Sequence, residues 1–218
     1  MKSIRNIIFD FGGVIYDIDY EKPVQTFKEI GIDQFDMMYS KAVQNHLFEN
    51  LECGLISPAE FRKRLKSHEY AHLSDDQIDY AWNSILTGFR KERLELLEKI
   101  KSNYNIYLLS NSNIIHYNVF LKEFQNITGY DSFDDLFLKA YYSFNIKCRK
   151  PDLAAYEYVL KDGAIKAEES LFIDDSIQNI EPAEKAGLSA YYLDLMKEDM
   201  VDLFEKKGAL KDSVLKKL

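Results

Sequence analysis

The stretch IIFDFGGV, residues 7–14, decides the fold. Its first three residues form a continuous apolar run, which is typical of a strand buried on both faces in a parallel sheet. The run ends at Asp10, and the two glycines that follow allow a flexible turn. The sequence therefore predicts a central strand that carries a carboxylate at its carboxyl end.

Further strands and helices alternate with one another after residue 90. Buried strands are expected in NIYLLSNS (105–112) and SLFIDDS (170–176), a further strand in SAYYLD (189–194), and a strand or strand–loop in KAYYSFNIK (139–147). Amphipathic helices are expected between them, and residues 195–218 also look helical. Strands alternating with helices indicate an α/β fold with a Rossmann-like, doubly wound parallel sheet.

The pattern of apolar residues changes between the first predicted strand and the later ones. Between residues 20 and 89 the apolar residues recur at helical spacing, Ser57-Pro58 and Ser74 resemble helix starts, and no strand is evident. We therefore expect an all-helical cap over residues 17–90, inserted into a core formed by residues 1–16 and 91–218.

Composition limits the class of protein. The 218 residues include 28 Lys and Arg against 36 Asp and Glu, a formal net charge of −8, which argues against a nucleic-acid partner. No apolar run approaches the ~18 residues of a membrane span. The two cysteines, Cys53 and Cys148, form neither a metal spacing nor a disulfide framework, which fits a reducing, cytoplasmic location. Composition does not indicate the oligomeric state.

The unusual polar residues gather at four predicted strand or loop ends. They are Asp10, Ser110 with Asn111, Lys150, and Asp174 with Asp175. In an open α/β sheet, ligands bind beyond the carboxyl ends of the strands, so these side chains are expected to face one crevice. Carboxylates, an ammonium group, a hydroxyl and turn amides suit Mg²⁺ together with a phosphate.

Four segments carry a family resemblance: IIFDFGGVIYDID, LLSNSN, RKPD and FIDDSIQNIEPAEKAG. Their order and spacing resemble the four signatures of the haloacid dehalogenase-like hydrolase superfamily, in its phosphatase branch with a small helical cap. The opening, and the segment GLIS at residues 54–57, also resemble the glucose-1-phosphatase-like subgroup. The resemblance implies hydrolysis of a small phosphorylated metabolite, with sugar phosphates foremost.

The resemblance also implies catalytic roles. Asp10 matches the nucleophile that forms an aspartyl-phosphate. Ser110 matches the hydroxyl that binds the transferring phosphoryl group, with the Asn111 amide beside it. Lys150 matches the lysine that balances charge between nucleophile and phosphate.

Metal-binding roles follow from the same resemblance. Asp10 and the Gly12 carbonyl match metal ligands, Asp175 matches a direct ligand of Mg²⁺, and Asp174 matches a direct or water-mediated one. Specificity in the family resides in the cap, where His46 and Glu49 are the candidate substrate contacts.

Two positions depart from the family pattern. Most of its phosphatases carry a general acid, Asp, where this chain has Gly12, and general acid–base help is worth roughly 10²–10⁴ in rate. We therefore expect a preference for leaving groups that need little protonation, such as anomeric, acyl or aryl phosphates, with Asp17 or Asp19 as possible replacement acids. Lys147 stands where the family usually has Gly.

Two alternatives stay open from the sequence. One is a 2-haloacid dehalogenase that uses Asp10 without metal. The other is a phosphate-binding protein that keeps the fold and has lost turnover together with the acid.

Overall fold

A five-stranded parallel sheet forms the centre of the computed structural model, which describes residues 3–32, 46–66 and 71–218. The strand order is β5-β4-β1-β6-β7. The strands are β1 (Asn6–Phe9), β4 (Asn105–Ser110), β5 (Lys139–Tyr142), β6 (Ser170–Asp174) and β7 (Ser189–Tyr192). The chain builds outward from β1 in both directions, which confirms the doubly wound arrangement and places its switch point at β1.

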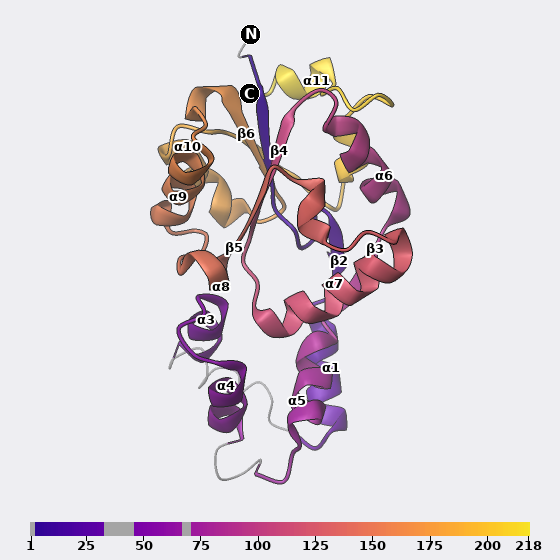
Figure 1. The fold of residues 1–218 in the computed structure, drawn as a ribbon, viewed down its shortest axis with the longest axis vertical. Coiled ribbons are helices and arrows are strands. Elements are labelled where there is room, and N and C mark those ends of the chain that lie inside the picture. Colours follow the sequence, from indigo (N-terminus) through magenta and orange to yellow (C-terminus); the bar gives the residue numbers. More distant parts are fainter. Residues whose placement is uncertain (1–2, 33–45, 67–70) are drawn as a thin grey trace.

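Alternate residues of the strands face two separate hydrophobic clusters. Ile7 and Phe9 pack on one face with helices α6 (Lys91–Ile100) and α7 (Ile114–Thr128), whereas Ile8 packs on the other with α9 (Leu153–Gly163) and α10 (Ile180–Lys185). Figure 1 shows α9 and α10 on one side of the sheet and α6 on the other. Burial on both faces explains the uninterrupted apolar runs of β1 and β6.

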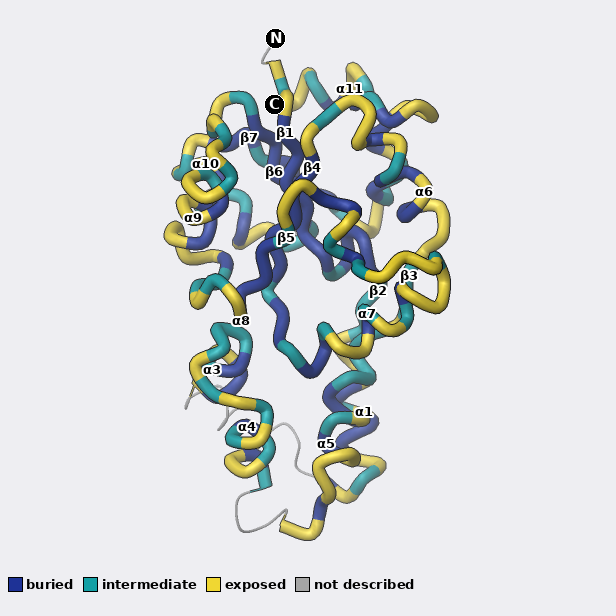
Figure 2. The backbone as a smooth tube through the Cα atoms, viewed as in Figure 1, coloured by how far each residue is buried: buried dark blue, intermediate teal, exposed yellow. Residues whose placement is uncertain are grey.

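The inserted segment places its own helices at the far end of the molecule from the chain termini (Figure 1). They are α1 (Glu21–Glu29), α3 (Leu47–Glu52), α4 (Pro58–Leu65) and α5 (Asp75–Asn83). As the sequence predicts, the Ser57 and Ser74 side chains accept hydrogen bonds from the amides that begin α4 and α5. The buried residues of these helices form a third hydrophobic cluster, visible as dark segments in Figure 2.

A short antiparallel ribbon connects the helical insertion to the sheet. It pairs β2 (Tyr16–Ile18) with β3 (Leu86–Phe89). The expectation of no strand between residues 20 and 89 is therefore wrong for the last four residues of that range, which form β3. The two strands show no long apolar run, because pairing with each other rather than burial stabilises them. The division into residues 1–16, 17–90 and 91–218 stays a prediction.

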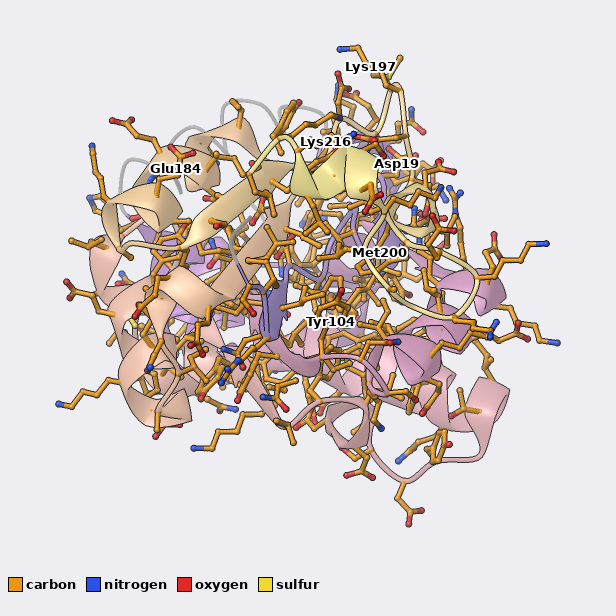
Figure 3. All side chains as sticks on the ribbon, turned by 90° about the horizontal axis from the view of Figure 1, so that it is seen from above. Asp19, Tyr104, Glu184, Lys197, Met200 and Lys216 are labelled. Carbon is orange, nitrogen blue, oxygen red and sulfur yellow. The ribbon has the colours of Figure 1, made fainter. Side chains whose placement is uncertain are left out.

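The carboxyl-terminal segment is mostly irregular, which corrects the prediction of a helix over residues 195–218. A single 3₁₀ turn covers Met200–Leu203, and α11 is limited to Asp212–Leu215. In Figure 3, Met200 lies within the packed side chains and Lys197 projects outward. The Tyr104 hydroxyl accepts a hydrogen bond from the Leu210 amide, and Met200, Leu203, Phe204, Leu210 and Val214 are buried in the core cluster, so the segment packs on the core as a strap. Among the described residues, no helix combines the length and apolar character that crossing a membrane requires.

His116 contacts the helical insertion from the core, and its burial is expected to make the stability of the fold sensitive to acid. Its Nδ1 lies 2.8 Å from Asn83 Oδ1, and burial lowers the pKa of His116 to about 3. The unfolded chain, with an ordinary pKa of about 6.5, binds more protons between these values, so stability falls as pH drops below 6.5. We expect a loss of about 2 kcal/mol from this residue between pH 7 and pH 5.

The measurement is urea unfolding at both pH values for the wild type and for His116→Gln. The glutamine keeps a polar amide and does not titrate, so its stability difference between pH 7 and pH 5 should be smaller. Equal differences in the two proteins would contradict the assignment.

Candidate active site

The chemically distinctive side chains lie where the central strands end. Asp10 follows β1 directly, Ser110 is the last residue of β4, and Asp174 is the last residue of β6. Because β1 pairs in parallel with both β4 and β6, their carboxyl ends meet at one edge of the sheet. Lys150 comes from the loop between α8 (Ser143–Ile146) and α9.

Lys150 is the centre of this site. Its Nζ lies 2.5 Å from Asp10 Oδ1 and 2.7 Å from Asp174 Oδ2, with only 2% of the residue exposed. Burial opposes its charge, yet the two carboxylates outweigh burial and raise the pKa of Lys150 above its ordinary value. A buried, charged ammonium is therefore held directly beside the proposed nucleophile.

Asn111 fixes the backbone of Lys150. Its Oδ1 accepts a hydrogen bond from the Lys150 amide at 2.9 Å, and its Nδ2 donates to the Lys150 carbonyl at 2.7 Å. The residue that follows β4 is thereby bonded to the loop between α8 and α9, 39 positions further along the sequence. Both the oxygen and the nitrogen of the Asn111 side chain therefore hold the backbone of the loop that carries Lys150, which we call the lysine loop.

Asp174 is fully buried and its oxygens are engaged. Besides Lys150, it accepts hydrogen bonds from the Ser176 amide at 2.7 Å and from Asn179 Nδ2 at 3.1 and 2.9 Å. Sequence reasoning missed Asn179, which lies five residues after Asp174 and whose part in the site shows only in these contacts. These bonds orient Asp174 toward the lysine.

Three carboxylates converge at the site. Asp10, Asp174 and Asp175 each offer an oxygen within 4.8 Å of the others. Burial raises the pKa of Asp10 to about 7, against the opposing charge of Lys150, and burial and the charge of Asp174 raise the pKa of Asp175 to about 6. Excess negative charge concentrated in a buried oxygen-rich site is the setting that a hard divalent cation satisfies.

The absence of a side chain at Gly13 leaves the space that the Asp175 carboxylate occupies. Gly13 has φ +80°, and a Cβ there would lie 2.3 Å from Asp175 Oδ2. Both the left-handed backbone and the close approach therefore require glycine. Gly12, by contrast, has no positive φ, and the nearest atoms to a Cβ there would belong to the Ile18 side chain, with Cδ1 at 3.1 Å.

The two acids suggested as replacements for the missing proton donor have other partners. Asp17 accepts from Arg90 Nε at 2.6 Å and from Arg93 Nη1 at 3.0 Å, in an ion-pair cluster that also contains Asp199. Asp19 Oδ1 accepts a hydrogen bond from the Glu21 amide at 2.9 Å, where α1 begins. The structure thus assigns Asp17 to the hinge of the insertion rather than to proton transfer.

His46 and Glu49 pair with each other rather than with the carboxylate cluster. His46 Nδ1 lies 2.5 Å from Glu49 Oε2, and both line a cavity of about 480 Å³ with Asn50, Cys53, Leu55, Arg149, Pro151 and Asp152. Asp10 and Asp175 are not among its lining residues. Contact of His46 or Glu49 with substrate stays a prediction.

Lys147, the second departure from the family pattern, has φ 63°, the left-handed conformation that favours glycine. Its Nζ donates to the Phe144 carbonyl at 2.8 Å and to the Gly54 carbonyl at 2.9 Å. The backbone therefore keeps the conformation that a glycine would adopt, and the side chain adds a bond to α3's end.

Known proteins resemble this chain over nearly its whole length. The family model described as haloacid dehalogenase-like hydrolase matches residues 4–187. D-ribitol-5-phosphate phosphatase of Bacteroides thetaiotaomicron is 31% identical over 86% of this chain and 91% of its own.

Two solved structures share the whole architecture. A family enzyme of Bacteroides thetaiotaomicron, solved with magnesium and inorganic phosphate, is 35% identical over 93% of this chain and all of its own, with a TM-score of 0.82. A hydrolase of Porphyromonas gingivalis described as haloacid dehalogenase-like is 30% identical over 92% of this chain and 95% of its own, with a TM-score of 0.81. With the family match and the phosphatase relative, they show that this chain belongs to the haloacid dehalogenase-like hydrolases, as a phosphoric monoester hydrolase.

Proposed function

We propose that the protein is a Mg²⁺-dependent phosphatase that hydrolyses a small sugar or polyol phosphate through an aspartyl-phosphate on Asp10. The observation that carries the proposal is the Lys150 ammonium bridging Asp10 and Asp174 at the carboxyl ends of the central strands. The named activity of the Bacteroides relative, on D-ribitol 5-phosphate, supports the substrate class.

The donor set fits Mg²⁺. Asp10, Asp175 and the Gly12 carbonyl would hold the ion, whereas the oxygens of Asp174 already accept from Lys150, Ser176 and Asn179, so Asp174 would act through water or through the lysine. When bound, the ion supplies Lewis-acid stabilisation of charge on the phosphoryl oxygens.

The reaction itself uses side chains of this chain. A carboxylate oxygen of Asp10 attacks phosphorus while the bond from phosphorus to the leaving oxygen breaks. Water then attacks the same phosphorus, which releases inorganic phosphate and restores the Asp10 carboxylate. Ser110 donates its hydroxyl to the phosphoryl group, and Asn111 holds Lys150 in place.

Charge is the main obstacle to the first step. Each pair of unit negative charges at ~4 Å repels by about 4 kcal/mol at an effective dielectric near 20. Lys150, which is buried beside Asp10, offsets this repulsion without the reorganisation that water would need. The helical insertion next to this edge of the sheet favours small substrates over macromolecules.

Chelation tests the metal requirement. Without a metal ion, the positive charge described beside the three carboxylates is the Lys150 ammonium. Hydrolysis of a panel of phosphorylated metabolites should therefore vanish after EDTA treatment and return when Mg²⁺ is added. Release of inorganic phosphate is the measurement. Turnover of 2-haloacids that survives EDTA would favour the dehalogenase alternative, and metal binding without hydrolysis of any phosphate would favour the non-catalytic one.

Position 12 tests the leaving-group preference. With glycine there, log kcat/KM should fall steeply as the leaving-group pKa rises across aryl, anomeric and primary alkyl phosphates. In Gly12→Asp, the Cβ requires Ile18 to shift by a few tenths of an ångström, and the carboxyl group would supply the general acid that most phosphatases of the family carry at this position. We therefore expect the variant to flatten the dependence, with a gain of up to roughly 10² for primary alkyl phosphates.

Gly12→Asn is the matched control, because asparagine has the same shape and no proton to deliver. It should keep the steep dependence. A flat dependence in the wild type, or the same flattening in both variants, would contradict the role given to position 12.

A further inference from the structure

The end of α3 and the loop before Lys150 lie against each other in a fixed register. Arg149 Nε is 2.9 Å from Glu52 Oε2, and Lys147 Nζ is 2.9 Å from the Gly54 carbonyl. Position 52 thus contacts position 149, and position 54 contacts position 147. Cys53 and Cys148 are the residues that lie between these two pairs of contacting positions along their segments.

The backbones approach closely where these two segments meet. Gly54 has φ +59°, and a Cβ on it would lie 2.4 Å from the Phe144 carbonyl oxygen, so there is no side-chain layer between the two segments here. Both thiols are free and partly exposed. Burial raises the pKa of the Cys53 thiol, and the charges of Glu52 and Cys148 add to that rise.

We propose that Cys53 and Cys148 form a reversible disulfide that ties the helical insertion to the lysine loop, with a low-molecular-weight disulfide such as oxidised glutathione as the oxidant. Their spacing in the sequence gives neither a metal spacing nor a disulfide framework, so this proposal rests on the fold alone. Separation along the chain does not limit a cross-link; the distance across the fold does, with Cα atoms about 4.4–6.8 Å apart in a finished disulfide.

The exchange balances in two steps. Cys53, which lines the 480 Å³ cavity beside Arg149, loses its proton and attacks one sulfur of the oxidant. A mixed disulfide forms and the first small thiolate leaves, taking up a proton. Cys148 then loses its proton and attacks the Cys53 sulfur, so the protein disulfide forms and the second small thiol is released. Two protein thiols are oxidised and one small disulfide is reduced to two thiols.

The consequence for turnover rests on the proposed function. The disulfide would join α3 to the residue two positions before Lys150 and restrain any movement of the insertion relative to the site. Loops and lids that admit substrate and release product set many turnover rates. We therefore expect the oxidised protein to turn over several-fold more slowly, and a dithiol reductant to restore the rate.

The experiment incubates the reduced, full-length protein with oxidised glutathione at pH 8.5, where more of each thiol is ionised. Free-thiol titration should fall from two to zero per chain, the intact mass should fall by about two hydrogens with no glutathione attached, and a peptide map should join the segments containing residues 53 and 148. Cys53→Ser and Cys148→Ser are the matched controls. Because each variant keeps a single cysteine, it should retain one free thiol or carry one glutathione adduct, and it should form no internal disulfide.

Glutathione adducts on both cysteines of the wild type, disulfide-linked dimers, or two thiols that remain unreacted would each overturn the proposal. A cross-link that leaves turnover unchanged would overturn its regulatory part. A cross-link in a protein that hydrolyses no phosphate when reduced would instead overturn the proposed function, so the two failures are distinguishable.

Discussion

Asp10→Asn is expected to lower kcat for phosphate release by roughly 10⁴–10⁶, because removing a catalytic nucleophile leaves only binding and electrostatic contributions. Asparagine has the shape of aspartate and its carbonyl can still accept from Lys150, which also keeps its 2.7 Å contact with Asp174. The variant should therefore fold, and steady-state kinetics with the best substrate of the panel measures the loss.

The control for this variant is Asp131→Asn, which removes an exposed carboxylate outside the site. It should retain wild-type kcat. Circular dichroism and thermal unfolding establish that both proteins are folded. An Asp10→Asn protein that keeps a tenth or more of the wild-type kcat, roughly, would rule out Asp10 as the nucleophile.

Lys150→Met is expected to lower kcat/KM by roughly a thousandfold, since about 4 kcal/mol of repulsion at ~4 Å is no longer offset. It should also destabilise the metal-free protein by about 3–5 kcal/mol, because it leaves Asp10, Asp174 and Asp175 close together without their ammonium partner. Added Mg²⁺ should recover part of that stability, so its effect on thermal unfolding should be larger in the variant than in the wild type.

Lys91→Met is the matched control, since the Lys91 side chain is 83% exposed and pairs with Glu95 on its own helix. Its kinetics and its response to Mg²⁺ should be unchanged. Equal effects of Mg²⁺ on the stability of all three proteins would show that Lys150 does not neutralise the carboxylate cluster.

The strands and their polar ends are what the sequence predicts well. The runs ending at Asp10 and Asp174 are apolar because helices cover both faces of the sheet. An uninterrupted apolar run in the sequence therefore marks a central strand, and the polar residue that ends it marks the edge where the site lies. Parallel strands bring their carboxyl ends to one edge, and this made the convergence of residues 10, 150 and 174 predictable.

What the sequence could not predict depends on contacts between distant segments. The ribbon of β2 and β3 gains its stability from pairing, and the terminal strap from packing on the core, so neither has a periodic signature. Asn179 is informative only once its bond to Asp174 is known. The meeting of Cys53 with the lysine loop requires the fold itself.

Mapping the phosphorylated residue tests the central claim most directly. Enzyme mixed with ³²P-labelled substrate and Mg²⁺ is quenched with acid within one turnover. One portion is digested at acid pH to locate the labelled peptide. A second portion is reduced with borohydride, which displaces the phosphate, and is then sequenced by mass spectrometry. We expect the label on the peptide that contains Asp10 in the first portion, and homoserine in place of Asp10 in the reduced portion. Label on any other residue, or none in a preparation that turns over the same substrate, would contradict it.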